Sequence, residues 1–296
     1  MDPVVFIEVN RETGLPLARG KKKKVSEYVA LTVDEAMNAL RTRRQEFSFY
    51  RNKDIDTYNV YFAISDAKVP EIFVMKRYKK VNTSFKMERY AFARIKEMDE
   101  LCRGTLIEGK PIINSSKSIY WILMEYFDGS VIEMERELTE SERRYILKTI
   151  AKAVKCLRES KLYYTDMKLD QVLYRIKDDE SIEVKLADLE VSGKGEDAIV
   201  TYRPPKGSKF LDSSGHYKYG ATDEAVNWGL VILILQLWTK DNRSLRHAFR
   251  KYYRNHHAMM SALKGKVPDD IYYLVNELYS KWDSISCDEL FKALQI

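Results

Sequence analysis

The 296-residue sequence lacks any long hydrophobic run, which argues against a membrane-spanning helix. The longest apolar stretch, residues 228–238 (WGLVILILQLW), is shorter than the roughly 20 residues that cross a bilayer, so we interpret it as a buried helix. The chain begins MDPVVFIEVN, whose early acidic residue and short apolar run are unlike a signal peptide. We therefore expect a soluble intracellular protein, cytoplasmic or nuclear, with no membrane partner.

Cysteine is also scarce. Cys102, Cys156 and Cys287 are far apart and form neither a Cys-x-x-Cys motif nor the spacing with histidine that zinc sites use. An odd number of separated cysteines in an intracellular protein is typical of free thiols, which we expect here.

Neither sign of charge dominates. The 50 basic and 44 acidic side chains give a net charge of +6, which we expect to be spread over a large surface. Nucleic acid is therefore not an expected partner. Residues 21–24 are four lysines, compatible with a nuclear import signal or a phosphate-rich partner, although a solvated loop is favoured.

The patterning favours strands in the first half and helices in the second. We expect helices at 34–45, 84–101 (with Ser84 as N-cap) and 141–160, and further helices from about 223 onward. Strands are expected at 46–50, 58–65, 71–78, 105–113, 118–126, 162–168, 172–176 and 183–190, and VVFIEV near the start could add another. The change of character falls near residues 127–130.

Three charged motifs follow in order: FVMK at 73–76, YTDMKLDQVLY at 164–174 and LADLE at 186–190. A lone strand lysine or Asp-x-Lys pair is usually a solvated surface feature. The ordered set resembles the eukaryotic protein kinase family over roughly residues 45–290. The resemblance implies an α+β, bilobal fold with a small β-rich N-lobe carrying one main helix and a larger helical C-lobe. It predicts an extension at 1–45, an N-lobe at 46–127 and a C-lobe at 128–296.

The resemblance also implies a nucleotide site. It assigns Lys76 to the ATP α- and β-phosphates and Glu88 to an ion pair with Lys76. WILMEYFDGS at 121–130 resembles the segment that contacts adenine. The implied nucleotide-binding residues there and on neighbouring strands are Met124, Glu125, Tyr126, Phe127, Val60 and Leu173.

Catalysis is assigned in the same way. Asp166 would orient the substrate hydroxyl and accept its proton, and Lys168 would offset charge on the transferring phosphoryl group. Asp188 would bind Mg²⁺, with Gln171 as a second metal ligand. Residues 201–207 (TYRPPKG) resemble the end of the activation segment, and Asp223 or Glu224 is expected to anchor the catalytic loop backbone.

Several positions depart from the family pattern. The stretch YRNKDIDTYNVYF at 50–62 contains no glycine, whereas the family's phosphate-covering loop is glycine-rich so that backbone N–H groups can approach phosphate. Gln171 stands where the family has Asn, Tyr164 and Thr165 replace its His-Arg, and Lys206 replaces the Glu of Ala-Pro-Glu.

The favoured hypothesis is an ATP- and Mg²⁺-dependent serine/threonine protein kinase, with Mn²⁺ as a substitute metal, of the divergent kind found in large DNA viruses. A viral kinase would act in the host cell or the virion. The main alternative is a pseudokinase that binds regulatory protein partners. Transfer to a small molecule or lipid, and a basic nucleic-acid-binding domain, are less favoured.

Overall fold

The structure is a computed structural model that describes residues 5–8, 28–31, 58–64, 72–78, 80–114, 119–125, 127–196, 200–205, 209, 211–213 and 220–294. Before Val74 it describes the backbone of the strands alone. The expected helix at 34–45, the strand at 46–50, the lysine run, and the glycine-free stretch before Tyr58 lie outside the described residues. The chain divides into two compact units, Met1–Phe92 with Glu108–Tyr126, and Ala93–Ile107 with Phe127–Ile296.

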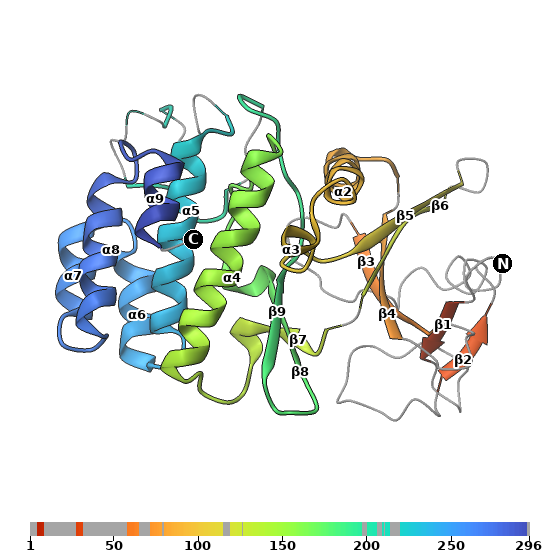
Figure 1. The fold of residues 1–296 in the computed structure, drawn as a ribbon, viewed down its shortest axis with the longest axis horizontal. Coiled ribbons are helices and arrows are strands. Elements are labelled where there is room, and N and C mark those ends of the chain that lie inside the picture. The colour runs from red at the N-terminus through yellow and green to blue at the C-terminus, as the bar shows by residue number, and fades with distance from the viewer. Residues whose placement is uncertain are drawn as a thin grey trace. The chain divides into compact units, whose positions relative to one another are not determined.

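The first unit contains a four-stranded antiparallel sheet (Figure 1). Its strand order is β3 (Tyr58–Ile64), β4 (Ile72–Tyr78), β6 (Ile119–Glu125) and β5 (Gly109–Asn114). The strand expected at 105–113 starts later, because Leu106 pairs with Leu186 of the second unit. The strand expected near the N-terminus is β1 (Val5–Glu8), which pairs with β2 (Tyr28–Leu31) in a separate sheet.

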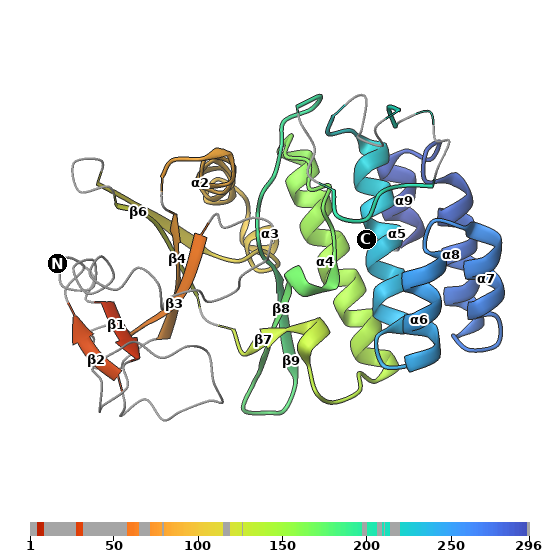
Figure 2. The same ribbon diagram turned by 180° about the vertical axis from the view of Figure 1, so that it is seen from behind.

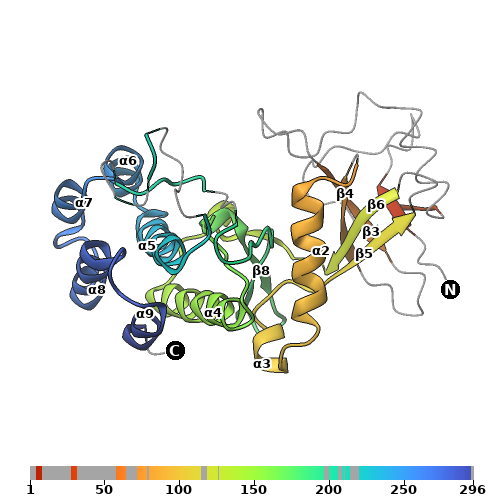
Figure 3. The same cartoon turned by 90° about the horizontal axis from the view of Figure 1, so that it is seen from above.

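Helix α2 (Thr83–Ile95) runs alongside the four-stranded sheet (Figure 3). It is capped by Asn82, whose side-chain oxygen accepts a hydrogen bond of 2.9 Å from the Phe85 N–H, so the prediction of Ser84 as N-cap was wrong. Phe92 on the buried side of α2 explains the glycine at the start of β5. A Cβ on Gly109 would lie only 2.5 Å from the Phe92 ring, so any larger residue would displace this contact.

The second unit is mainly helical. Its helices are α3 (Glu100–Arg103), α4 (Glu140–Glu159), α5 (Asp223–Thr239), α6 (Arg243–Tyr252), α7 (His256–Leu263), α8 (Asp269–Lys281) and α9 (Cys287–Ala293). The long apolar stretch lies in α5, which is buried on all sides from Ala225 to Thr239, so the prediction of a buried helix is confirmed. None of the helices in the described ranges is long and apolar enough to cross a membrane.

A three-stranded sheet in this unit joins β7 (Gly129–Ser130), β8 (Val172–Ile176) and β9 (Ile182–Leu186). The strand predicted at 162–168 is wrong. Apart from an isolated bridge between Tyr163 and Ser192, this segment is a loop. Its apolar residues Leu162, Tyr163, Tyr164 and Met167 are all buried, because they pack into the core beneath the loop.

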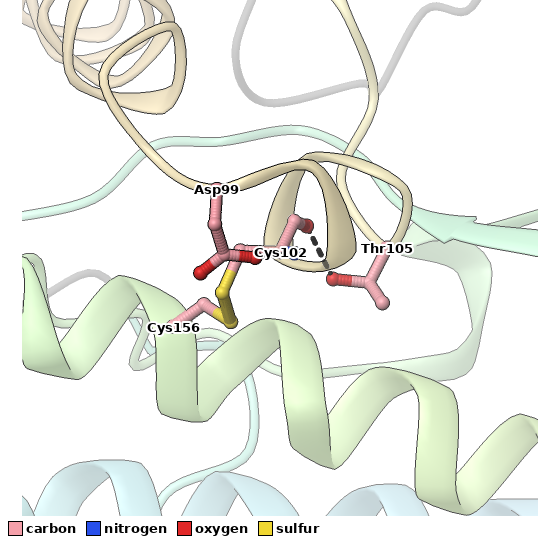
Figure 4. Close-up of a disulfide and its surroundings, with 4 residues drawn as sticks. All are labelled: Asp99, Cys102, Thr105 and Cys156. Atoms are coloured by element: carbon pink, nitrogen blue, oxygen red, sulfur yellow. Dashed lines mark hydrogen bonds between the residues drawn. A yellow bond between two sulfur atoms is a disulfide. The ribbon is translucent and has the colours of Figure 1, made fainter.

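A disulfide joins Cys102 of α3 to Cys156 of α4, with a Cα–Cα distance of 5.8 Å (Figure 4). The Asp99 carboxylate caps α3 by accepting a hydrogen bond of 2.9 Å from the Cys102 N–H, and the Thr105 hydroxyl donates to the Cys102 carbonyl at 2.7 Å. The expectation of three free thiols was therefore wrong for this pair. Sequence spacing could not reveal it, since the two cysteines are 54 residues apart. Cys287 is free and buried.

Candidate active site

The first unit carries a buried ion pair. Lys76 lies in the middle of β4, and its Nζ is 2.6 Å from Oε1 of Glu88 in α2. Tyr78, two residues along the same strand and therefore on the same face, donates a hydrogen bond of 2.6 Å to the other Glu88 oxygen. A buried pair is favourable when its remaining polar atoms are also satisfied, and Tyr78 supplies that bond. The structure thus brings the predicted Lys76 and Glu88 together and adds Tyr78, which the sequence interpretation missed.

The predicted adenine-contacting segment spans the division between the units. Met124 is buried in β6, and Glu125 binds Glu108 twice, by backbone N–H to carbonyl at 3.3 Å and by its carboxylate to the Glu108 N–H at 2.8 Å. Phe127 is buried in the second unit, where the Arg175 guanidinium lies 4.8 Å from its ring centre.

The other predicted nucleotide residues lie on neighbouring strands or outside the description. Leu173 is half-buried in β8 and pairs with Ser130. The backbone of Val60 pairs with Lys76 in the sheet. Tyr126 and the Val60 side chain are outside the described residues.

In the second unit, Asp166 lies in the loop between α4 and β8. Its Oδ2 is 3.0 Å from Lys168 Nζ and 3.0 Å from the Thr201 hydroxyl, and its Oδ1 accepts a hydrogen bond from the Thr201 N–H. The Lys168 ammonium also donates to the Thr201 hydroxyl at 3.1 Å. The structure therefore brings the predicted Asp166 and Lys168 together and adds Thr201, which is far away in sequence.

The electrostatics keep Lys168 charged. Burial lowers the pKa of its ammonium, but the negative charges of Asp166, Asp170 and Asp188 together outweigh this effect, so the pKa is raised above its usual value. Asp170 itself is an exposed residue, yet desolvation of its carboxyl group by the surrounding protein raises its pKa. The raised pKa keeps an ammonium beside Asp166 that can donate charged hydrogen bonds to a phosphate oxygen.

Asp188 follows β9 and has a φ of 54°, a left-handed conformation that is uncommon outside glycine. Such backbone strain is often found at functional sites. The Nε2 atom of Gln171 lies 3.5 Å from Oδ2 of Asp188, so the two predicted metal ligands are neighbours.

The buried Tyr164 hydroxyl is a hydrogen-bond partner of Gln171. It lies 2.7 Å from Gln171 Oε1 and 2.9 Å from the Ala187 carbonyl oxygen. A hydroxyl has one proton and cannot donate fully to both oxygens. If the amide is turned by 180°, Gln171 donates to Tyr164 and Tyr164 donates to Ala187. In the structure the amide nitrogen faces Asp188; in the turned form the amide oxygen would face the Asp188 carboxylate, an arrangement that a bound cation would stabilise.

This arrangement fits a hard divalent cation. Mg²⁺ is usually held by one or two protein oxygens and completed by phosphate oxygens and water, so it does not need a cage of side chains. Among the described residues, no group of three or more His, Cys, Asp or Glu side chains is placed to hold a metal ion. Asp188 and Gln171 would supply the protein oxygens.

Helix α5 and the end of α6 hold the loops around Asp166. Gln236 of α5 accepts a hydrogen bond of 2.7 Å from the Leu169 N–H, and Trp228 Nε1 donates to the Tyr202 carbonyl at 2.7 Å. Arg254 Nε donates to the Pro204 carbonyl at 2.8 Å.

Asp223, one of the two expected anchors of the catalytic loop, instead binds Arg158 of α4 through two hydrogen bonds of 3.0 Å. Gln236, three turns further along α5, is the side chain that reaches the loop backbone.

A comparison with protein families agrees with this architecture. The family model described as protein kinase domain matches residues 57–288, well over half of the chain. The protein therefore belongs to the protein kinase family, as the motifs predicted, and has its α+β, bilobal fold. Membership of this family supports, in general, phosphoryl transfer from ATP to proteins with a divalent metal ion.

Proposed function

We propose that the protein is an active serine/threonine kinase that uses ATP with Mg²⁺. The observation that carries this proposal is the grouping of Asp166, Lys168 and Thr201, in which a carboxylate, an ammonium and a hydroxyl are within about hydrogen-bond distance of one another. The Thr201 hydroxyl occupies the kind of position beside Asp166 that a substrate hydroxyl requires. The carboxylates that raise the pKa of Lys168 include Asp188, so the proposed metal ligand lies within electrostatic reach.

The proposed reaction divides the roles among these side chains. Asp166 orients a Ser or Thr hydroxyl and accepts its proton as the hydroxyl oxygen bonds to the γ-phosphorus and the bond to ADP breaks. Lys168 offsets negative charge on the transferring group, while Lys76, held by Glu88, binds the other phosphates. A metal ion held by Asp188 and Gln171 would neutralise phosphate charge. Residues 46–127 and 128–296 would be the two lobes, preceded by an extension at 1–45.

The test is transfer of labelled phosphate from ATP to a generic protein substrate. We expect Asp166→Ala and Lys76→Met to reduce transfer by about a thousandfold or more, because each removes a group that acts in the transition state. Asp178→Asn is the matched control, since Asp178 is an exposed turn carboxylate. Full activity in Asp166→Ala, with the wild-type fold by circular dichroism, would refute the assigned role.

A pseudokinase is the second candidate, favoured by the glycine-free stretch at 50–62 and by the occupation of both Asp166 oxygens by Thr201. A ligand that binds the folded state raises the melting temperature. We expect ATP to do so more strongly with Mg²⁺ than without it. If ATP causes no thermal shift and the protein transfers no phosphate, the pseudokinase is favoured.

A further inference from the structure

The positive charge of the chain is concentrated in one segment of the second unit. Residues 242–268 contain no Asp or Glu, although the whole chain has a net charge of only +6. The cations of this segment are Arg243, Arg246, Arg250, Lys251, Arg254, Lys264 and Lys266. The expectation of an evenly spread charge was therefore wrong, and the segment without acidic residues accounts for the whole excess.

Helix α6 sorts this segment into two faces. Leu245, Ala248 and Phe249 are buried against the unit. Arg243, Arg246 and Arg250 are all exposed and follow the spacing i, i+3, i+7, so they form one stripe along the opposite side, which we call the basic face. Figure 2 shows α6 beside α5 and α7 within this unit. Among the described residues, none of these three arginines forms an ion pair, whereas Arg136, Arg143, Arg144 and Arg158 all do.

The helix that carries the basic face is also attached to the candidate active site. The Tyr202 ring packs against Phe249 of α6 at 5.4 Å and against Tyr253 at 5.3 Å, between ring centres. Tyr202 directly follows Thr201, which binds Asp166. A protein that meets α6 is therefore close, within the same unit, to the segment beside the proposed catalytic carboxylate.

We propose that the basic face of α6 docks an acidic segment of the protein substrate. The proposal rests on the proposed kinase function and names the substrate class for it. Guanidinium groups bind carboxylates through paired hydrogen bonds, and three unpaired ones in a row complement a run of Asp or Glu. The stripe is about 10 Å long, which matches about four residues of extended chain.

Other anionic partners fit less well. The family acts on proteins, so an acidic protein segment is favoured over nucleic acid as the partner of the basic face. An anionic membrane would be met by a broader basic surface with apolar residues interleaved, whereas the stripe itself contains only arginine.

The experiment compares two variants with equal changes in net charge. The first is Arg243→Glu with Arg246→Glu and Arg250→Glu. The control is Lys96→Glu with Lys148→Glu and Lys292→Glu, which reverses three exposed lysines elsewhere in the second unit. Steady-state kinetics use dephosphorylated casein as an acidic substrate and myelin basic protein as a basic one. Circular dichroism melts check that each variant is folded. If the charge-reversal variant does not fold, Arg→Gln at the same three positions replaces it.

We expect the basic-face variant to raise KM for casein by about tenfold or more, with kcat and the KM for ATP unchanged, because three screened charge pairs are lost and repulsion is added. Activity on myelin basic protein should not fall. The effect should shrink as salt is raised.

Binding of both variants to phosphatidylserine vesicles and to an oligonucleotide is measured as well. Three results would overturn the proposal: unchanged casein kinetics in the basic-face variant, equal losses of casein activity in both variants, or a basic-face variant that loses binding only to the vesicles or the oligonucleotide. Casein binding is also measured by fluorescence anisotropy with the Asp166→Ala background. The binding measurement therefore tests docking even if the wild type transfers no phosphate. A lack of transfer would refute the kinase proposal alone.

Discussion

Tyr164 and Gln171 differ from the family pattern at two positions that touch each other. The tyrosine hydroxyl is 2.7 Å from the glutamine amide, so the longer stem of Gln171 is held by a group that the family's histidine does not supply. Two departures from the family pattern therefore form a consistent pair. With the amide turned by 180°, Tyr164 would hold its nitrogen and leave its oxygen facing Asp188.

We predict that Tyr164→Phe raises the Mg²⁺ concentration needed for half-maximal activity by about tenfold, because groups that orient metal ligands typically matter by that amount. The Mg²⁺-dependent part of the thermal shift with ATP should weaken in parallel. The control is Tyr163→Phe, a neighbouring buried tyrosine whose pKa is raised by burial and by the charge of Asp223 rather than by Asp188. An unchanged metal dependence in a folded Tyr164→Phe protein would show that the hydroxyl has only a packing role.

At the scale of the element, α4 begins with a reciprocal cap. Thr139 accepts a hydrogen bond from the Glu142 N–H, and Glu142 accepts one from the Thr139 N–H. Arg136 also binds the Glu142 carboxylate at 2.5 Å. The hydrogen bond from Arg136 is the main cause that lowers the pKa of Glu142 to about 2.

A depressed folded-state pKa stabilises the protein above the unfolded pKa, and this stability is lost as pH falls toward the folded value. We predict that Glu142→Gln lowers the free energy of unfolding by about 1–2 kcal/mol at pH 7, a range reduced for solvent screening. The difference between variant and wild type should shrink between about pH 4.5 and pH 2. Denaturant melts across this range measure it, and a pH-independent difference would contradict the assigned pKa.

The disulfide connects α3 to α4 within the second unit. Closing a loop of this length restricts the unfolded chain and is worth about 4 kcal/mol by the chain-entropy estimate. We predict that a reductant lowers the melting temperature of the wild type but not of the Cys102→Ser, Cys156→Ser double variant. Cys287→Ala should keep the full response to the reductant, since Cys287 is not in the bond.

Elements with a clear apolar period were predictable, and those decided by long-range contacts were not. The helix expected at 141–160 is α4, because one face of it is apolar at every turn. The loop at 162–168 was predicted as a strand because it is a short run rich in apolar and aromatic residues, which the structure buries beneath a loop instead. Within the helical region expected from about residue 223 onward, Asn255 caps a new helix, α7, by accepting a hydrogen bond of 3.0 Å from the Ala258 N–H.

The same division applies to the candidate site. Asp166 and Lys168 are two residues apart, so the sequence alone suggested that they would act together. Thr201 and Gln236 lie in distant segments, and only the folded chain shows that they bind this loop.

At the scale of the whole molecule, the family match over residues 57–288 unites the two units in one activity. One unit holds the buried Lys76–Glu88 pair, and the other holds Asp166, Lys168, Asp188 and the basic face of α6. In this account, phosphate binding and phosphate transfer are divided between units, and substrate choice belongs to the second. Lys76→Met in the first unit and Asp166→Ala in the second should therefore each abolish transfer without unfolding the other unit.

The most direct test of the central claim is to map, by mass spectrometry, the phosphorylated residues that the purified protein produces from ATP and Mg²⁺. The account predicts phosphoserine and phosphothreonine on added casein, and neither with Asp166→Ala. Phosphotyrosine alone, or no phosphorylated protein although ATP raises the melting temperature, would contradict it.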